Sequence, residues 1–309
     1  MCLARAVYRD TMTLIAVLTP DPADPSYTRQ WPGVLERLQI ALAGEGVEVV
    51  PTAWTDHVDS AEALMAYPLV LPLLAWGYYS DHDRWLAATT LWDRAGVAMA
   101  NPASVLAWNS DKAYLRRLAE AGVPIAPTLW SATPTADQIA DAFDAFGTDQ
   151  VVVKPTVSGG AWRTLRVARG EAVLEADLPL GATMIQPYLP TIETEGETSL
   201  LFFGGRFSHA VNKRPVNGDF RIQVQYGGQY RTLETPPAAC MALAQQVLAA
   251  VEEPLLYARI DMAPDAGGNW ILMEAELIEP DFYLGSDPAE GAGFARAVCE
   301  RLGQSGLEN

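Results

Sequence analysis

The sequence predicts a mixed α/β and α+β fold, in which a parallel α/β domain precedes a longer, strand-rich part. The chain has 309 residues, too many for one ordinary hydrophobic core and enough for two or three domains. From Met12 to about Ala107, apolar strands alternate with amphipathic helices, a pattern typical of a parallel sheet covered on both faces. After this stretch, strands outnumber helices, which indicates a second kind of architecture.

The first domain, expected at residues 11–107, is predicted from apolar runs bounded by turn residues. The dinucleotide fingerprint G-x-G-x-x-G is missing after its first strand, where LTPDPADPSY stands instead, so a dinucleotide site is not expected. The expected strands are 13–19, 47–54 and 68–74, and the expected helices are 31–46, 60–67 and 83–97.

The second part is expected to begin with a helix that Asn109 or Ser110 caps. Asp111 favours the positive end of this helix, which should continue to Gly122 before Pro124 stops it. Strands and helices of the same apolar kinds follow. The further strands are expected at 150–155, 164–169, 182–190, 198–205, 206–213, 257–264 and 269–280, and the helices at 135–146, 236–252 and the C-terminus.

Composition narrows the range of partners. The formal net charge of −17 at pH 7 argues against nucleic-acid binding, although a local basic pocket could still bind a nucleotide. Three cysteines, widely spaced and odd in number, favour a reducing cytoplasm. The most apolar stretch is interrupted by Pro68 and Pro72, and the first residues lack a signal-peptide pattern. We therefore expect a cytoplasmic protein without a membrane or nucleic-acid partner.

Lysine is rare in this chain. Only Lys112, Lys154 and Lys213 occur, whereas arginine supplies every other fixed positive side chain. Lys154 ends the apolar strand VVVK, where an unpaired ammonium is costly to bury, so an anionic ligand is expected beside it. Gly159 and Gly160 follow in a loop whose backbone N–H groups can approach phosphate oxygens. A hairpin turn and a solvated surface position for Lys112 are the alternatives, and a Walker motif is absent.

An acidic cluster near the C-terminus is the strongest chemical signal. Asp261 lies on one expected strand, and Glu274 and Glu276 lie two residues apart on the next. Their period-two spacing places both glutamates on one face, where they could converge with Asp261. Three carboxylates in an apolar setting require cations, and hard oxygen donors suit Mg²⁺. A solvated face of an edge strand is the alternative. Arg259, two residues before Asp261, is expected on the same face.

Six motifs occur in order between residues 101 and 309. They are Lys112, VVVKPTVSGG, MIQPYLPTIETEGETS, NKRP with the later GDFRIQVQYGG, ARIDM and MEAELIEP. This order resembles the ATP-grasp superfamily, and within it the branch of glutathione synthetase and the ribosomal-protein glutamate ligase. The resemblance implies a pre-ATP-grasp domain at 11–107, followed by a two-part ATP-grasp module with a small subdomain at 108–189 and a catalytic subdomain at 190–309.

The resemblance implies an ATP site that uses the lysines and the glycine loop. Lys112 would contact the α-phosphate, and Lys154 would meet phosphate and the edge of adenine. The loop with Ser158, Gly159 and Gly160 would form a mobile flap over the phosphates.

The stretch MIQPYLPTIETEGETS resembles the hinge of the family together with the acidic segment after the hinge. Its glutamine, and the backbone of the tyrosine and leucine, would contact adenine. Either of the first two glutamates after the hinge would bind the ribose hydroxyls, and the third is a further candidate for the nucleotide pocket. An acidic loop without a ligand is the alternative. The residues are Gln186, Tyr188, Leu189, Glu193, Glu195 and Glu197.

The metal and phosphate groups complete the implied site. The family usually has Glu-x-Asn where this chain has Glu274-Ala275-Glu276, which leaves the coordination open, and Glu279 is a possible further member. The resemblance makes Arg259 the residue that stabilises the charged intermediate. Positive groups that clamp transferring phosphoryl groups and carboxylates are expected at Lys213, Arg214 and Arg221.

The expected function is an ATP- and Mg²⁺-dependent carbon–nitrogen ligase for a small amino-acid-like substrate, in a protein that could form a homodimer. The ligase would activate a carboxylate, or a carbonyl-type oxygen, as an acyl phosphate and join it to a nitrogen nucleophile. Three stretches also resemble a branch that includes the ring-closing ligase of D-cycloserine biosynthesis, so intramolecular closure is an alternative: WNSDKAYLRRLAEAGVPIAPT, QPYLPTIETEGETSLLFFGGRFSHAVNK and LMEAELIEP. A nucleotide-binding sensor is a second alternative, and a dehydrogenase lacks its phosphate fingerprint. The loop at residues 19–31 is expected to wall the pocket, because ligands of open α/β sheets lie beyond the carboxyl ends of the strands.

Overall fold

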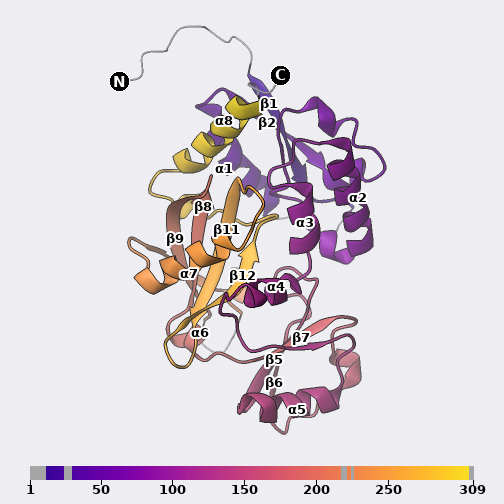
Figure 1. Cartoon of the computed structure of the whole chain (residues 1–309), viewed down its shortest axis with the longest axis vertical. Coiled ribbons are helices and arrows are strands. Elements are labelled where there is room, and N and C mark those ends of the chain that lie inside the picture. The colour runs from indigo at the N-terminus through magenta and orange to yellow at the C-terminus, as the bar shows by residue number, and fades with distance from the viewer. Residues whose placement is uncertain (1–11, 24–29, 217–220, 224–225, 306–309) are drawn as a thin grey trace.

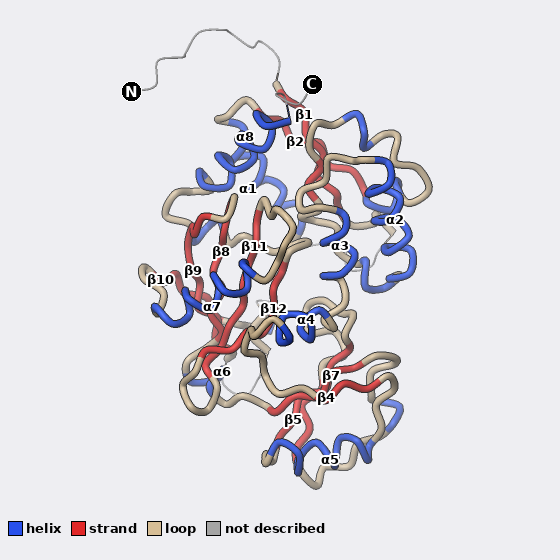
Figure 2. Tube along the Cα trace, in the orientation of Figure 1, coloured by secondary structure: helices blue, strands red, loops and turns tan. Residues whose placement is uncertain are grey.

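The computed structural model describes residues 12–23, 30–216, 221–223 and 226–305 (Figure 1). Its described strands form three sheets that follow one another along the long axis of the molecule. A three-stranded sheet lies at one end, a five-stranded sheet in the middle and a four-stranded sheet at the other end (Figure 2). No helix among these residues is long and apolar enough to cross a membrane.

The three-stranded sheet is parallel, as the alternation of strands and helices predicts. Its elements are β1 (Thr13–Thr19), α1 (Trp31–Ala43), β2 (Val47–Ala53), β3 (Val70–Leu71) and α2 (His82–Ala95). The strand order is β2-β1-β3, and β1 pairs in parallel with both neighbours. Helix α1 forms because its apolar residues recur every three or four positions, so that one side is buried against the sheet. The carboxyl ends of the three strands therefore point in one direction.

Two predictions for this domain are wrong in detail. The helix expected at 60–67 is only a short 3-10 turn, Leu64–Ala66, after which Tyr67 is extended. Tyr67 precedes Pro68, and a residue before proline is disfavoured in the helical conformation. The strand expected at 68–74 has two residues, because Pro72 cannot donate to a ladder.

The four-stranded sheet is antiparallel and carries one helix. Its elements are β4 (Leu129–Ser131), α5 (Ala136–Phe146), β5 (Gln150–Pro155), β6 (Leu165–Ala168) and β7 (Thr183–Pro187), in the strand order β4-β7-β5-β6. Helix α5 begins with a capping box, in which the Thr135 hydroxyl accepts from the Gln138 N–H and the Gln138 side chain accepts from the Thr135 N–H. Ile139 and Phe143 of this helix pack on Val151 and Val153 of β5.

The five-stranded sheet is also antiparallel. Its elements are β8 (Glu197–Phe203), β9 (Arg206–Arg214), β10 (Gln229–Leu233), α7 (Ala238–Ala249), β11 (Tyr257–Pro264), β12 (Trp270–Glu276) and α8 (Ala292–Ser305), in the strand order β10-β9-β8-β11-β12. The sequence did not predict β10. Strands β8 and β11 lie inside the sheet, and all of their residues are buried.

Residues 101–122 connect the first domain to the rest and differ from the prediction. Two helices are present, α3 (Ala103–Asn109) and α4 (Tyr114–Glu120), instead of one that begins at Asn109 or Ser110. Asn109 caps no helix. Its side-chain amide donates to Ala275 O at 2.9 Å and accepts from Leu277 N at 3.0 Å, and so it fixes the end of β12.

The first and second sheets along the molecule share a hydrophobic core. Ile15 and Leu38 belong to the same buried cluster as Phe203, Phe282 and Phe294. A division of the chain into the ranges 11–107, 108–189 and 190–309 therefore remains a prediction. The arrangement brings three separate parts of the chain around one space.

Candidate active site

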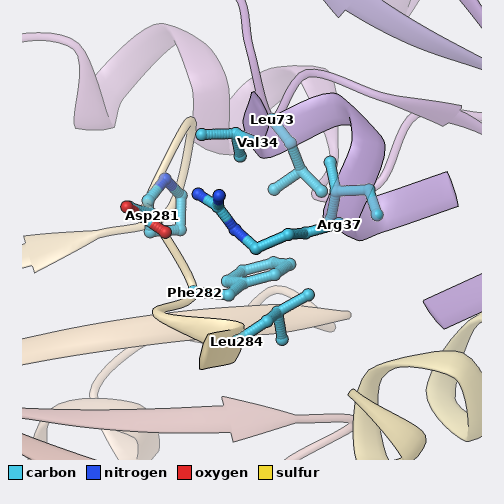
Figure 3. Close-up of a pocket in the computed structure, with 8 residues that line it drawn as sticks. Val34, Arg37, Leu73, Asp281, Phe282 and Leu284 are labelled. Carbon is cyan, nitrogen blue, oxygen red and sulfur yellow. The ribbon is translucent and has the colours of Figure 1, made fainter. Parts of the chain in front are cut away.

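A cavity of about 1120 Å³ lies where the sheets meet. Residues of β5, β7 and the glycine loop line one part of it, and residues of β8, β9, β11 and β12 line another. Helix α1 and the segment after β3 contribute from the first domain. A second cavity beside it, bounded by Val34, Arg37 and Phe282, has only about 10 Å³ (Figure 3). A space of this size holds at most one water, so the large cavity is the candidate site for an organic ligand.

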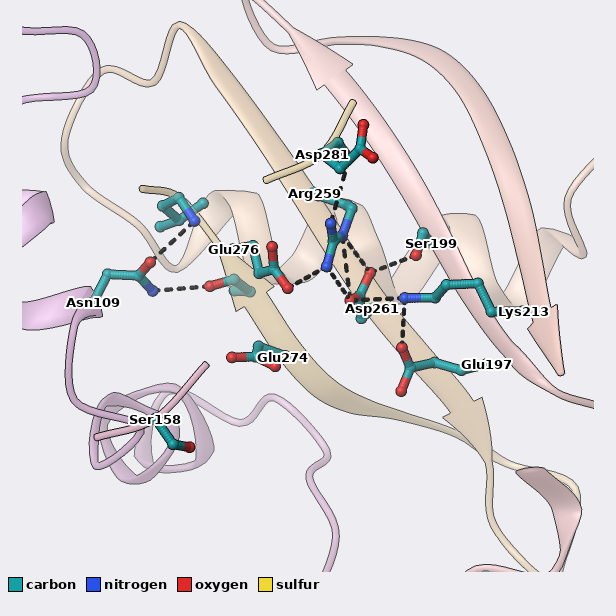
Figure 4. A network of polar contacts seen from close by, with 12 residues as sticks. Asn109, Ser158, Glu197, Ser199, Lys213, Arg259, Asp261, Glu274, Glu276 and Asp281 are labelled. Carbon is teal, nitrogen blue, oxygen red and sulfur yellow. Dashed lines mark hydrogen bonds and ion pairs between the residues drawn. The ribbon is translucent and has the colours of Figure 1, made fainter. Parts of the chain in front are cut away.

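Strands β11 and β12 bring opposite charges together. Arg259 lies opposite Glu276 across the two strands, and Asp261 lies opposite Glu274, so the four side chains share a face, as their period-two spacing predicts. The Arg259 guanidinium donates to both carboxylate oxygens of Asp261, at 3.0 and 2.9 Å, and also contacts the Glu276 carboxylate (Figure 4). This forked geometry fixes the guanidinium in a plane facing the cavity.

Lys213 completes a buried network that we call the charged centre: Glu197, Lys213, Arg259, Asp261 and Glu276. Its ammonium donates to Asp261 Oδ2 at 3.0 Å and to Glu197 Oε1 at 2.7 Å. Burial by itself would raise the pKa of Asp261, but Arg259 and Lys213 outweigh this effect and hold the pKa well below its ordinary value. Burial would lower the pKa of Lys213, and the carboxylates of Asp261 and Glu197 raise it well above its ordinary value. Both groups are therefore charged at neutral pH.

The three expected magnesium ligands each have a cationic partner. Asp261 is bound by Arg259 and Lys213, Glu276 by Arg259, and Glu274 by Lys112, whose ammonium lies 3.0 Å from it. Within the part of the chain that the structure describes, no group of three acidic, histidine or cysteine side chains is arranged to hold a metal ion.

The chemistry of these groups nevertheless fits Mg²⁺. Burial raises the pKa of Glu276 well above its ordinary value, because Arg259 offsets only part of the cost. A further cation beside Glu276 would lower that cost, and carboxylate oxygens are donors that Mg²⁺ prefers.

The expected phosphate lysines line the same cavity. The Lys112 ammonium also donates to Ser158 O at 2.7 Å, which ties the segment between α3 and α4 to the glycine loop. Burial lowers the pKa of Lys154, and Glu274 only partly counters this. No carboxylate among the described residues lies within ion-pairing distance of Lys154. An anionic ligand would therefore stabilise its charged form.

The glycine loop approaches an aromatic side chain of the first domain. A Cβ atom on Gly159 would lie 2.9 Å from Cε1 of Tyr79, closer than real contacts allow. Gly160 has a φ of 58°, in the left-handed region that favours glycine. The rings of Tyr79 and Trp162 lie 6.0 Å apart, so this loop closes the cavity from the side of the four-stranded sheet.

The hinge residues form an apolar slot. Val152, Leu189, Ile192 and Met273 line it together with Gln186, whose side chain donates to Thr128 Oγ1 at 2.8 Å. Apolar side chains that several elements contribute to one part of a cavity are suited to a nucleobase.

Three expected nucleotide glutamates lie in different places. Glu197 lines the cavity, whereas Glu193 and Glu195 are not among the residues that do. The Glu193 carboxylate lies 3.1 Å from Arg166 and accepts from the Tyr188 hydroxyl, with 47% of its side chain exposed. Tyr188 lines the cavity as expected, and Arg166 stacks on its ring.

The expected clamp of positive groups is only partly assembled. Lys213, Arg221 and Arg259 line the cavity, but Arg214 does not. Arg214 follows Lys213 directly on β9, so its side chain points to the opposite face of the sheet. There it is exposed and donates a hydrogen bond to Asn212.

Several cavity residues were not anticipated from the sequence. Trp76, Tyr78 and Tyr79 follow β3, at the carboxyl end of a parallel strand, which is the general position for ligand contacts. Tyr283 has a φ of 48° and places its ring 5.2 Å from the Arg259 guanidinium and 5.9 Å from the Lys213 ammonium. Of the expected loop at 19–31, residues 24–29 lie outside the described residues, and Gln30 lines the cavity.

Comparison with known proteins gives relatives by sequence, although no family model matches. The cycloserine biosynthesis protein DcsG of Streptomyces lavendulae is 30% identical over 222 residues, which cover 66% of this chain and 73% of that protein. Glutathione synthetase of Prochlorococcus marinus is 30% identical over 219 residues, which cover 68% of this chain and 66% of that protein.

Solved structures show the same arrangement of sheets. The crystal structure of the D-cycloserine synthetase DcsG superposes with a TM-score of 0.74 and 26% identity, and covers 94% of this chain and 99% of that one. The D-alanine–D-alanine ligase of Bacillus anthracis superposes with a TM-score of 0.70 over 97% of this chain and 100% of that one, at 15% identity. The second comparison concerns the fold alone.

Proposed function

The chain belongs to the ATP-grasp superfamily of ligases, near the cycloserine ligase, and on that premise we propose its reaction. MgATP phosphorylates a substrate carboxylate, a nitrogen nucleophile displaces the phosphate, and ADP and phosphate leave. The observation that carries this proposal is the charged centre: Lys213 and Arg259 are held by Asp261 inside a cavity that also presents Lys112 and Lys154.

We assign the nucleotide to the space between the four-stranded and five-stranded sheets. The apolar slot at Val152, Leu189 and Met273 would hold adenine, and Glu197 would be the ribose ligand. Lys112, Lys154 and the glycine loop would hold the phosphates, because a compact ammonium on a flexible stem suits a phosphate oxygen. On this assignment, residues 108–189 close over the nucleotide and residues 190–309 carry the chemistry.

Asp261, Glu274 and Glu276 are the residues that would hold Mg²⁺. Bound there, the ion would neutralise charge on the transferring phosphoryl group. Lys112 and Arg259 would then exchange part of their contacts with these carboxylates for contacts with phosphate oxygens, since both cations already line the cavity.

The remaining steps use residues of the charged centre. Lys213 and Arg259 stabilise the negative charge that develops as the carboxylate attacks the γ-phosphate, and Asp261 keeps both cations in place without reorganisation. Tyr283 and the loop from Ser158 to Trp162 exclude water, which would otherwise hydrolyse the acyl phosphate. The first domain would bind the substrate beyond the ends of its strands.

Intramolecular ring closure is the second candidate function. The similarity to the cycloserine biosynthesis protein DcsG favours it. In a ring closure, one molecule would supply both the activated group and the amine. A nucleotide sensor without turnover has no comparable support, since it would not require the charged centre.

Phosphate release with MgATP and a panel of small amino acids and amino-acid derivatives tests the ligase, with mass spectrometry of the products. A product whose mass equals the sum of two substrates minus one water supports intermolecular ligation. A single substrate that loses one water or ammonia supports ring closure. The absence of phosphate release with every compound would count against both.

A further inference from the structure

One carboxylate of the cavity, which the sequence offered only as a further member of the metal site, has no contact with the charged centre among the described residues. Glu279 follows β12 and lines the cavity at the boundary between the five-stranded sheet and the first domain. Its neighbours fix its position: Ile278 is buried in the core of the first domain, and Ile278 O accepts from the Tyr257 hydroxyl at 2.7 Å. Pro280, which is also buried, follows it. The side chain is thus presented on a rigid piece of backbone.

Glu279 differs from the other carboxylates in its charge environment. Asp261, Glu274 and Glu276 each have a lysine or arginine nitrogen within ion-pairing distance. Within the part of the chain that is described, no such nitrogen lies within 4.0 Å of Glu279. Lys112 acts on it only from farther away, because Glu274 already holds that ammonium.

Burial disfavours the ionised form of the Glu279 carboxylate. It raises the pKa of Glu279 to about 7, with Lys112 opposing the shift and Glu274 adding to it. A cationic ligand would reverse the effect, since an opposite charge nearby favours the ionised form. Trp76 and Tyr78 line the same cavity, the charge of Glu279 acts on Tyr78, and the faces of aromatic rings also attract cations.

The groups that line the cavity indicate which kind of cation would bind beside Glu279. An ammonium group has three donors and can satisfy a carboxylate and a water or ring face at once. Lys213 and Arg259 lie in the same cavity and are the groups that would receive the substrate carboxylate. A molecule with a carboxylate at one end and an ammonium at the other matches this distribution of charge.

We propose that Glu279 binds the ammonium group of the substrate and thereby selects amino acids over carboxylic acids that lack the amine. The proposal rests on the proposed ligase function for the location of the substrate carboxylate. It assigns to Glu279 a role in recognition and none in the transfer of the phosphoryl group.

The test uses pairs of probes that differ only in the charged group: D-alanine with D-lactate, L-alanine with L-lactate, and glycine with glycolate. Binding to the full-length protein is measured with Mg²⁺ and a non-hydrolysable ATP analogue, by the fluorescence of the tryptophans and by calorimetry. The wild-type protein should prefer at least one amino acid over its hydroxy acid by roughly 10- to 100-fold, the value of a hydrogen bond to a charged group. Glu279→Gln should abolish that preference and leave hydroxy-acid binding unchanged.

Controls separate this role from others. Glu279→Asp, which keeps the charge, should retain a preference, and Glu62→Gln, at an exposed position of the first domain, should behave as wild type. Equal responses of the wild-type protein to both members of every pair, including no response to either, would overturn the proposal. So would a preference that persists in Glu279→Gln, or a variant whose defect is a higher requirement for Mg²⁺.

The ligase function is judged separately by phosphate release. A wild-type protein that prefers amino acids but releases no phosphate would retain the Glu279 site and lose the ligase proposal. A protein that turns over, with a preference independent of Glu279, would do the reverse.

Discussion

The two sides of the cavity treat positive charge differently. On the five-stranded sheet, Lys213 and Arg259 are held by carboxylates at hydrogen-bonding distance before any ligand is bound. On the four-stranded sheet, Lys154 is half-buried, and none of the described carboxylates pairs with it. One side is thus organised in advance, and the other depends on a ligand to satisfy its charge.

The difference has a physical basis in the sheets. Strands β8 and β11 are buried along their full length, and a charge in that setting must be paired within the protein. Strand β5 alternates buried and half-buried residues, so its lysine can keep contact with some solvent until a ligand binds. We infer that the five-stranded sheet supplies preorganised electrostatics, whereas the four-stranded sheet supplies binding that is coupled to closure.

The largest effect is expected from removing the negative charge of Asp261, which holds Lys213 and Arg259 in place on the five-stranded sheet. Asp261→Asn leaves Lys213 and Arg259 facing each other with less compensation, so turnover should fall by roughly 100- to 1000-fold. The thermal midpoint should also fall, because breaking a buried pair costs about 3 kcal/mol or more. Steady-state phosphate release and differential scanning fluorimetry measure the two effects. An exposed control, Asp59→Asn, should change neither.

Unchanged turnover in Asp261→Asn would show that the charged centre is structural and that the chemistry occurs elsewhere. Unchanged stability with lost turnover would mean that solvent compensates the two cations in the free protein.

On the side of the four-stranded sheet, a substitution should weaken ligand binding without lowering the stability of the protein. Lys154→Met should weaken binding of the ATP analogue by roughly 10- to 100-fold, because a charged hydrogen bond to phosphate is lost. Its thermal midpoint should not fall, since the substitution removes a partly buried cation that pairs with none of the described carboxylates. Lys154→Arg should not restore affinity, because a planar guanidinium does not replace a compact ammonium. Calorimetric titration with the analogue compares the three proteins.

A fall in the thermal midpoint of Lys154→Met in the absence of nucleotide would remove the contrast between the two sides. Restored affinity in the arginine variant would reduce the choice of lysine to charge alone.

Glu279 lines the cavity without a cationic partner among the described residues, unlike Asp261, Glu274 and Glu276. The effect of its buried charge on the free energy of unfolding can be measured. Its pKa lies near 7 in the folded protein and near 4.5 in the unfolded chain, because burial disfavours the charge. The folded state therefore binds more protons between these values, and stability is lost as the pH rises from about 4.5 to 7. Glu279→Gln should match the wild-type protein at pH 4.5 and exceed it by roughly 3 kcal/mol at pH 8.

Urea unfolding of both proteins at the two pH values measures this difference. Histidines also titrate in this range, but they are common to both proteins and cancel. A constant difference at both pH values would place the Glu279 carboxylate in a more solvated environment than the structure indicates.

The sequence predicts the charged residues of the five-stranded sheet better than those of the four-stranded sheet, because their arrangement depends only on local strand geometry. The alternation of side chains along a strand is independent of tertiary context, so the spacing of Arg259, Asp261, Glu274 and Glu276 places them correctly on one face. The same rule, applied to β9, would have excluded Arg214, which follows Lys213 and points away. That exclusion required only knowledge of where the strand runs.

Contacts between residues far apart in the chain could not be predicted from the sequence. Asn109 has the side chain of a good helix cap, but its amide serves the end of β12, which is 166 residues away. The pair of Lys112 with Glu274 likewise joins distant segments. Aromatic residues such as Tyr79 and Tyr283 carry no sequence pattern that distinguishes a cavity wall from a core.

The choice among three glutamates was also undecidable from spacing, and it depends on a turn. The short helix α6 (Thr191–Thr194) keeps Glu193 outside, and Gly196, with a φ of 85°, redirects the chain so that Glu197 enters β8 beside Lys213. A Cβ atom on Gly196 would lie 2.7 Å from Lys213 O, so no other residue fits this turn.

The smallest expected effect tests this assignment. Glu193→Gln should change the KM for ATP by less than about twofold, because an exposed ion pair such as that with Arg166 contributes little. Glu197→Gln should raise that KM by roughly tenfold, since a ribose hydroxyl loses a charged acceptor. The effect should be smaller with 2′,3′-dideoxy-ATP, which lacks the hydroxyls, and this comparison separates ribose recognition from a general defect caused by the loss of a partner for Lys213. A larger effect of Glu193→Gln than of Glu197→Gln, absent with the dideoxy nucleotide, would transfer the ribose contact to Glu193 and imply that α6 moves toward the cavity when ATP binds.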